Sequence, residues 1–220
     1  MGDKTNSTCN ARASYMSAFE IADIIGIICF ALSGFLIGVH CKLDILGVFI
    51  SAFLTAFGGG MIRDVLADRT PYVFTSNLPL TLVIGTVLIA ILFKLHKITN
   101  LEGKWAFIIS DAIGLVSFSI TGSIIAIESG FNFLSVLVLA FITAVGGGTI
   151  RDVLINRMPF ILVSEFYATV ALIIGSVIYL LEMFELRNFV SLSIVFVFGV
   201  VLRVLAYYRK WNLPTLIKDN

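Results

Sequence analysis

Long apolar stretches alternate with short polar connections along almost the whole chain. The apolar stretches are continuous, which is typical of transmembrane helices rather than of transmembrane strands. About 20 apolar residues are enough to cross a hydrocarbon core of about 30 Å, because each helical residue rises about 1.5 Å. The pattern therefore predicts an all-α integral membrane protein with seven transmembrane helices, at residues 19–39, 43–67, 79–95, 105–128, 132–155, 160–181 and 189–208.

The composition agrees with a protein that lies almost entirely in the membrane. Of the 220 residues, 59% are hydrophobic and only 13% are charged, whereas about 25% of the residues of a soluble domain are charged. The connections are too short to hold a soluble domain, so residues 1–220 are expected to form a single transmembrane domain. The net charge of +1 and the lack of a long basic run give no sign of nucleic-acid binding.

The sequence has no pattern typical of an enzyme or a metal site. It contains no phosphate-binding loop, no paired-histidine zinc motif and no Gly-x-Ser-x-Gly element. The three cysteines have no metal-ligand spacing. We therefore expect no catalytic residues, no metal and no bound cofactor.

Lysine and arginine are distributed unequally between the two sides of the predicted bundle. With seven spans, the side of the N-terminus carries five of the 15 basic residues and the opposite side carries ten. Basic connections are retained in the cytoplasm. The count predicts that the N-terminus lies outside the cell and the C-terminus in the cytoplasm.

One sequence unit recurs with a constant offset of 88 residues. The segment 53–66, FLTAFGGGMIRDVL, corresponds to the segment 141–154, FITAVGGGTIRDVL. The same offset aligns Asp23 with Asp111 and Arg69 with Arg157. The predicted organisation is a first repeat over about residues 19–95, a second over about 105–181, and an additional helix over about 189–208.

Each repeat contains three predicted spans, and three is an odd number. The second copy must then enter the membrane from the side opposite to the first. The two repeats are therefore expected to be related by a two-fold axis in the membrane plane, an architecture that recurs among transporters.

Both copies place three consecutive glycines and an Arg-Asp pair inside a span. Because each glycine costs about 1 kcal/mol relative to alanine in a helix, the triplets are expected to break or kink the second and fifth spans. Carbonyls freed there are suitable ligands for a monovalent cation, and a charge at the bilayer centre normally faces a bundle interior or an aqueous path. The candidate path residues are Gly58, Gly59, Gly60, Gly146, Gly147, Gly148, Arg63, Asp64, Arg151, Asp152, Thr55 and Thr143.

A structural role is the alternative for these residues. Glycines also let helices pack closely, Arg-Asp pairs can be salt bridges, and membrane threonines often bond their own helix. Asp23 and Asp111 are expected either to complement a helix N-terminus or to attract cations at two vestibules. The inverted duplication favours a polar path lined by both breaks, but the sequence does not separate lining from packing.

The doubled Gly-Gly-Gly-x-Ile-Arg-Asp-Val-Leu motif, in a chain of three plus three plus one spans, resembles the prokaryotic trimeric intracellular cation (TRIC) channel family. The resemblance covers roughly residues 19 to 208. It implies a homotrimer in the lipid of a bacterial or archaeal plasma (inner) membrane, in which each subunit has its own potassium-permeable pore. It also implies that the second and fifth helices are kinked at the glycine triplets and line that pore.

The resemblance makes a monovalent cation channel the first functional hypothesis. The same bacterial domain is also labelled a glycine transporter, so a secondary transporter of a small amino acid such as glycine is the second. A membrane assembly protein whose glycines only pack helices is the third.

Overall fold

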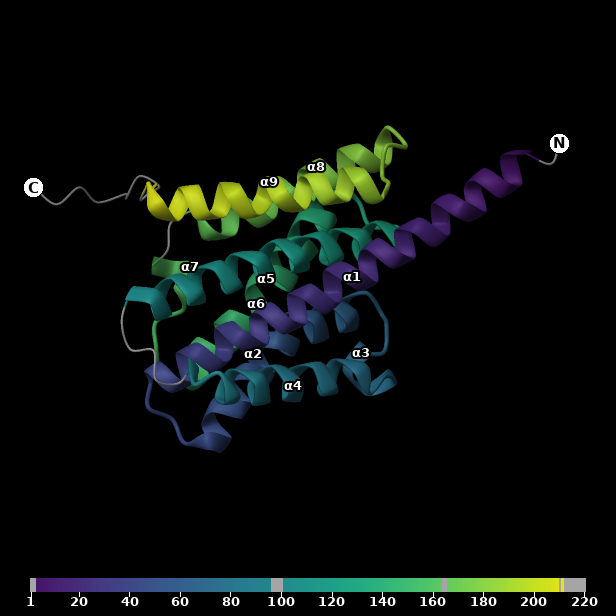
Figure 1. Cartoon of the computed structure of the whole chain (residues 1–220). Coiled ribbons are helices and arrows are strands. Elements are labelled where there is room, and N and C mark those ends of the chain that lie inside the picture. The colour runs from purple at the N-terminus through teal and green to yellow at the C-terminus, as the bar shows by residue number, and fades with distance from the viewer. Residues whose placement is uncertain (1–2, 96–100, 164–165, 210, 212–220) are drawn as a thin grey trace, which may run out of the picture.

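The computed structural model describes residues 3–95, 101–163, 166–209 and 211, and the side chains of 18–95, 105–162, 166–209 and 211. Within these ranges all regular secondary structure is helical, without strands, as the apolar pattern predicts. Figure 1 shows the helices α1 (Asp3–His40), α2 (Ile45–Leu66), α3 (Tyr72–Thr75), α4 (Leu78–Leu92), α5 (Leu101–Glu128), α6 (Phe133–Leu154), α7 (Phe160–Val163), α8 (Tyr167–Met183) and α9 (Phe189–Tyr208).

Five of the described helices are long and apolar enough to cross a membrane: Ala18–His40, Ile45–Leu66, Trp105–Glu128, Phe133–Leu154 and Phe189–Tyr208. The third predicted span, 79–95, corresponds to the shorter apolar helix α4, and the one-turn helix α3 lies before it. The sixth, 160–181, differs from the prediction, because it is interrupted between the one-turn helix α7 and the shorter apolar helix α8. One cause of the interruption before α8 is Phe166, which has a left-handed backbone (φ 68°) that a continuous helix cannot contain. The protein is a multi-pass membrane protein.

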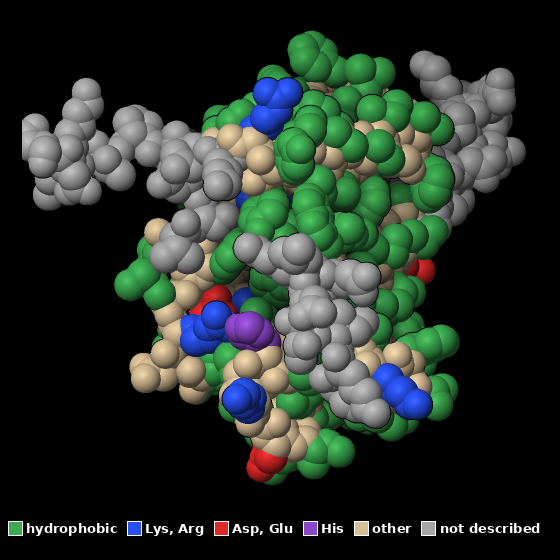
Figure 2. Space-filling view, turned by 60° about the vertical axis from the view of Figure 1, so that its left-hand side comes forward, with side chains coloured by type: hydrophobic (Ala, Val, Ile, Leu, Met, Phe, Trp, Pro, Cys, Tyr) green, Lys and Arg blue, Asp and Glu red, His purple; other side chains and the backbone are tan. Residues whose placement is uncertain are grey.

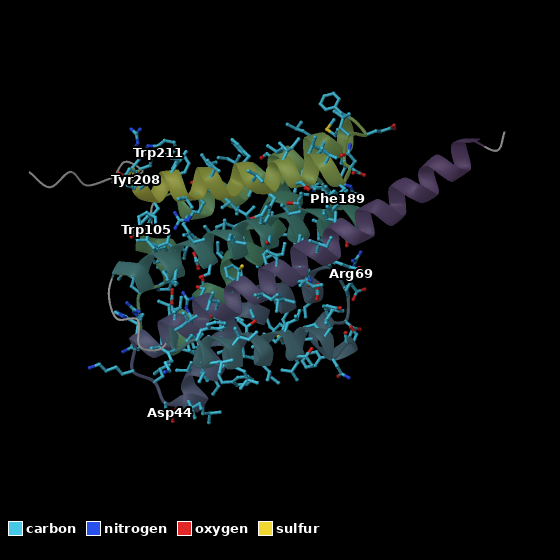
Figure 3. The ribbon with its side chains drawn as sticks, in the orientation of Figure 1. Asp44, Arg69, Trp105, Phe189, Tyr208 and Trp211 are labelled. Carbon is cyan, nitrogen blue, oxygen red and sulfur yellow. The ribbon has the colours of Figure 1, made fainter. Side chains whose placement is uncertain are left out.

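The described helices form one bundle whose two ends are distinct. Figure 3 shows Arg69 and Phe189 at one end, and Asp44, Trp105, Tyr208 and Trp211 at the other. The second end has ring contacts typical of a membrane interface, since the ring centroids of Trp105 and Tyr207 are 6.1 Å apart. In the bundle, α1 and α2 pack against α5 and α6 respectively, and α9 packs mainly on α5 and α8.

The two copies of the repeated unit begin and end their glycine-containing helices in the same way. The Asp44 side chain accepts a hydrogen bond from the Gly47 amide (2.7 Å) at the start of α2. Asn132, 88 residues later, accepts one from the Ser135 amide (3.0 Å) at the start of α6. After each helix a residue with φ 55°, Asp68 or Asn156, turns the chain. Local sequence thus determines where both helices begin and end.

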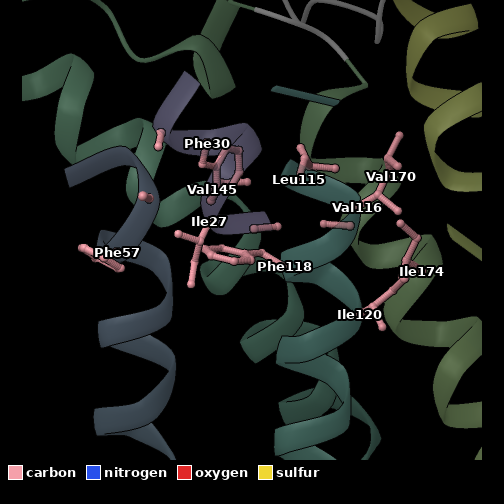
Figure 4. Packing of buried hydrophobic residues seen from close by; sticks show 14 of the residues in the cluster. Ile27, Phe30, Phe57, Leu115, Val116, Phe118, Ile120, Val145, Val170 and Ile174 are labelled. Carbon is pink, nitrogen blue, oxygen red and sulfur yellow. The ribbon is translucent and has the colours of Figure 1, made fainter. Parts of the chain in front are cut away.

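The core between α1 and α5 contains reciprocal contacts. The rings of Phe30 and Phe118 meet edge to face with centroids 5.1 Å apart, and Figure 4 shows them beside Ile27 and Val145. A side chain at Gly26 would collide with Phe118, and one at Gly114 would collide with Phe30. Gly114 and Phe118 are the residues 88 positions after Gly26 and Phe30, so each copy presents the same surface to the other.

The glycine triplets do not unwind their helices, so the expected break is wrong. α2 is continuous from Ile45 to Leu66 and α6 from Phe133 to Leu154, each including its triplet. The triplets instead let α2 and α6 pack backbone to backbone. A Cβ at Gly58 would lie 3.0 Å from the Gly147 Cα, and one at Gly59 or Gly147 would collide with the carbonyl of Thr143 or Thr55. Close interhelical packing is therefore what the glycines provide in this structure.

Much of the bundle surface is apolar. Hydrophobic side chains cover most of the face seen in Figure 2, with Lys and Arg side chains at separate points among them. Exposed fractions reach 78% for Ile45, 76% for Leu92 and 72% for Leu162. Such a surface is unfavourable in water and favourable against lipid chains or neighbouring subunits.

The α2–α6 packing predicts a position-specific cost of adding one methyl group. Gly59→Ala should destabilise the protein by about 1–3 kcal/mol, because its Cβ meets backbone that cannot move aside. Gly85→Ala in α4 is the matched control, since a Cβ there has nothing within 4 Å; alanine should be neutral or slightly stabilising. Thermal unfolding of the purified variants in detergent measures both, and equal midpoints would contradict close packing at Gly59.

Candidate functional site

The first buried charge cluster is built around Arg63 at the end of α2. The Arg63 guanidinium donates from Nε to Asp64 Oδ1 (2.8 Å) and from Nη1 to Asp23 Oδ1 (2.8 Å) and Thr121 Oγ1 (3.0 Å). The same guanidinium lies 5.7 Å from the centroid of the Phe19 ring. Arg63 is 2% exposed, so its charge is satisfied by partners from α1, α2 and α5 instead of by water.

The second cluster is built in the same way around Arg151 at the end of α6. Arg151 Nε donates to Asp152 Oδ1 (2.8 Å), and its Nη1 donates to Ser33 Oγ (3.3 Å). Ser33 in turn donates to Asp111 Oδ1 (3.4 Å). The Arg151 guanidinium lies 5.8 Å from the Phe107 ring, and Phe107 follows Phe19 by 88 residues.

Backbone groups after each helix hold the two carboxylates in place. The Tyr72 amide donates to Asp64 Oδ2 (3.1 Å), and the Phe160 amide donates to Asp152 Oδ2 (2.9 Å). These are the first residues of the one-turn helices α3 and α7. The one-turn helix that follows each glycine-containing helix is thus directly connected to its Arg-Asp pair.

The two arginines reach across to opposite halves of the chain. Arg63 bonds Thr121 in the second copy, and Arg151 bonds Ser33 in the first. Thr121 follows Ser33 by 88 residues. The hydrogen bonds therefore form a reciprocal pair, which is the pattern that a two-fold relation between the halves would produce.

A pocket of about 490 Å³ opens beside the first cluster. Asp23, Arg63 and Asp64 line it together with residues of the α2–α4 segment and of the end of α5. At its edge Arg69 donates to Glu128 (3.2 Å), in an exposed ion pair that joins the two copies. A smaller cavity of about 20 Å³ shares Asp23, Arg63 and Asp64 with this pocket and is also lined by Gly60 and Pro79. That volume holds about one water molecule.

The second cluster contains two further residues, Tyr167 of α8 and Arg203 of α9. The Tyr167 side chain interacts with the Asp111 carboxylate. The Arg203 guanidinium lies 4.6 Å from the centroid of the Tyr167 ring and 5.9 Å from that of Phe160. Both residues are buried. The repeat does not reveal them, because α9 lies outside it and position 79, which corresponds to Tyr167, is a proline; the arginine inside an apolar span was the available signal.

The remaining predicted site residues, two aspartates and two threonines, are all buried inside helices. Asp23 and Asp111 lie well inside α1 and α5, which begin at Asp3 and Leu101, so the interpretation that they complement a helix N-terminus is wrong. Both are buried within the charge clusters. The hydroxyls of Thr55 and Thr143 donate to carbonyls of their own helices, those of Ser51 (2.6 Å) and Leu139 (2.6 Å). In this conformation these two hydroxyls stabilise the helix backbone.

No group of three or more His, Cys, Asp or Glu side chains able to hold a metal occurs among the residues described. Each aspartate of the clusters instead faces arginine, hydroxyl or backbone N–H donors. Such an arrangement can stabilise buried carboxylates inside a membrane, and a carboxylate that is paired with one cation can in principle pair with another.

The first cluster predicts a large difference between two arginines close together in the chain. Arg63→Gln should destabilise the protein by about 3–5 kcal/mol, because it leaves two buried carboxylates without their cation. Arg69→Gln removes only an exposed pair, with side chains 42% and 44% exposed, and should cost about 0–1 kcal/mol. Denaturant or thermal unfolding in detergent compares the two, and a similar loss in both variants would rule out this assignment of the buried network.

Comparison with known sequences shows which family has this architecture. A family model described as glycine transporter matches residues 20–95 and again residues 108–183. The chain is 38% identical over 198 residues to the UPF0126 membrane protein YvgT of Bacillus subtilis (strain 168), covering 90% of this chain and 96% of that protein. It is 35% identical over 202 residues to the UPF0126 inner membrane protein YadS of Escherichia coli (strain K12), with coverages of 90% and 96%.

Solved structures agree with the sequence matches. A prokaryotic TRIC channel in 0.5 M KCl superposes with a TM-score of 0.80 at 36% identity, covering 89% of this chain and 98% of that one. A second solved structure, from work on the structural basis for conductance through TRIC cation channels, superposes with a TM-score of 0.78 at 34% identity. The match covers 92% of this chain and 98% of that one. The TRIC orthologue from Rhodobacter sphaeroides gives 0.80 at 26% identity, with coverages of 88% and 98%. The chain belongs to the UPF0126 membrane protein family, matched by the glycine-transporter family model, which is the family of the TRIC channels.

Proposed function

We propose that the protein is a monovalent cation channel, permeable to potassium, with a path between α2 and α6 of each subunit. The observation that carries the proposal is the open pocket of about 490 Å³ whose floor is the buried Asp23–Arg63–Asp64 network. The likeness to solved TRIC cation channels over most of the chain supports it.

The charge of the pocket favours cations. Its lining has two arginines, Arg63 and Arg69, and four carboxylates: Glu20, Asp23, Asp64 and Glu128. The formal excess of two negative charges raises the local cation concentration, and the low dielectric of the surrounding helices strengthens the effect. Membrane lipid would contact the outer surface of the subunit.

The glycine contact closes the path in the conformation seen here. Gly58 and Gly59 touch the backbone around Thr143 and Gly147, so no ion passes between α2 and α6 at that level. Separation of the two helices would open a route between the two charge clusters. Glycine makes bending at the triplets inexpensive, and the predicted kinks would then belong to the open state.

The proposed topology is the inverted one expected from the repeat. Seven crossings, with α3–α4 and α7–α8 as the third and sixth, would place the two termini on opposite sides of the membrane. The reciprocal contacts of Phe30 with Phe118 and of Arg63 and Arg151 with hydroxyls of the opposite copy support a two-fold axis in the membrane plane. The basic residues favour an N-terminus outside the inner membrane and a cytoplasmic C-terminus.

A homotrimer is the proposed assembly, in line with the trimeric channel from Rhodobacter sphaeroides. Exposed apolar residues of α4 and α9, such as Leu88 (61%) and Ile194 (64%), give the subunit surface that could contact other subunits or lipid. One path per subunit means that trimer formation would position pores side by side and would not create them.

Secondary transport of glycine is the alternative, named by the matching family model. The solved structures with the same fold are cation channels, which favours the channel. The pocket also has a negative charge excess, and both of its arginines are already paired with carboxylates, Arg63 with Asp23 and Asp64 and Arg69 with Glu128, which disfavours binding of an amino-acid carboxylate.

The channel proposal predicts discrete potassium currents from the purified protein in planar bilayers. Asp64→Asn should lower the unitary conductance and the preference for K⁺ over Cl⁻, because it removes a carboxylate from the pocket floor. The matched control is Glu185→Gln, an exposed carboxylate in the turn after α8 that does not line the pocket. It should leave both quantities unchanged.

The opposing result is equally specific. Saturable, ion-coupled uptake of labelled glycine into vesicles, without unitary currents from folded protein, would replace the channel by a transporter. Folded protein with neither currents nor uptake would favour the assembly role.

A further inference from the structure

The two charge clusters differ at one equivalent position. Pro79 in the first copy lines the cavity of about 20 Å³ beside Asp23. The residue 88 positions later is Tyr167, a larger side chain that is 4% exposed and interacts with Asp111. The first cluster thus has space for one small particle next to its aspartate, whereas the equivalent position of the second cluster has a buried aromatic side chain.

The clusters also differ in formal charge. The first has Arg63 with Asp23 and Asp64, which gives a net charge of −1. The second has Arg151 with Asp111 and Asp152, and it gains a second cation from Arg203 of α9. Its net charge is therefore zero. In a membrane interior this difference of one charge decides whether a further cation is attracted.

The position of Arg203 explains how it supplies that charge. Its guanidinium lies 4.6 Å from the centroid of the Tyr167 ring and interacts electrostatically with the Asp111 carboxylate. Stacking on tyrosine and phenylalanine stabilises a guanidinium away from water. Arg203 is 2% exposed, so this charge is a fixed part of the interior.

We propose that Arg203 is a built-in counter-cation that occupies, beside Asp111, the place which a permeating monovalent cation takes beside Asp23 in the first half. The inference rests on the proposed channel function and deepens it. An ion that crosses the second half must displace the guanidinium from Asp111 or pass it. Arg203 therefore limits cation occupancy in that half, and α9, the helix outside the duplication, makes the two halves of the path unequal.

The test removes the charge of Arg203 and measures potassium binding by a readout other than current. In Arg203→Gln, Asp111 lacks its second cation and should take a potassium ion. Potassium chloride should then raise the midpoint of thermal unfolding more than it does for the wild type, because a ligand that binds only the folded state stabilises it. N-methylglucamine chloride at equal ionic strength should not produce this rise. Unitary potassium conductance at low potassium should increase roughly twofold or more.

Two controls separate this role from simple packing. Arg203→Lys keeps a cation and should behave like the wild type. Arg209→Gln changes an exposed arginine directly after α9, and it should leave both the potassium dependence of unfolding and the conductance unchanged. The double variant Asp111→Asn with Arg203→Gln removes both charges and should lose the extra potassium dependence while remaining folded.

The other possible results of these experiments also support or overturn the proposed role of Arg203. If Arg203→Gln folds and responds to potassium as the wild type does, the inference is wrong. If Arg203→Gln folds only in potassium, or fails to fold while the double variant folds, the counter-cation role is supported. Failure of both variants to fold would overturn it in favour of packing. If the wild type conducts no ions, the proposed function fails, whereas the potassium dependence of unfolding still tests Arg203.

Discussion

Burial of two arginines in a low-dielectric interior is the constraint on which the rest of the structure depends. An unpaired charge there is strongly unfavourable, so Arg63 and Arg151 must each find carboxylate and hydroxyl partners at hydrogen-bond distance. The neighbouring aspartate supplies one partner from the same helix. The others come from α1 and α5, which must therefore pack closely beside both arginines. The one-turn helices α3 and α7 meet the same need, because the Tyr72 and Phe160 amides complete the aspartate shells.

The structure also depends on the close approach of α2 and α6. Glycines at the crossing bring the helix backbones into contact and place the two charge clusters on either side of it. Each arginine then reaches a hydroxyl of the opposite copy, which a larger interhelical distance would prevent. Close packing and the lining of a polar path are alternative roles for the glycine triplets when only the sequence is considered. In this arrangement the same glycines can have both roles. The same glycines that seal the crossing in this conformation are the residues least resistant to bending there.

The duplicated unit does not give two equal halves. An open pocket lies at the first cluster, and α9 adds Arg203 and contacts Tyr167 at the second. Duplication supplies a symmetric scaffold at low cost, and a helix outside the duplication modifies one half of it. A path with unequal ends responds differently to ions arriving from either side, which is a physical basis for directional behaviour in a passive protein.

The sequence alone determined the all-helical membrane class, the family and the pairing of residues 88 apart, because long apolar runs and a doubled motif are local and do not depend on contacts. It also determined the helix boundaries at Asp44 and Asn132, where short polar side chains cap the backbone. Tertiary structure decided what the glycines do. A glycine triplet can either unwind a helix or let a second helix pack closely against it, and only the position of the second helix distinguishes the two. It likewise decided that Thr55 and Thr143 bond their own helices, that Asp23 lies inside a longer helix, and that Arg203 joins the second cluster. Those outcomes depend on which side chains meet across the bundle, and no spacing along one chain specifies that.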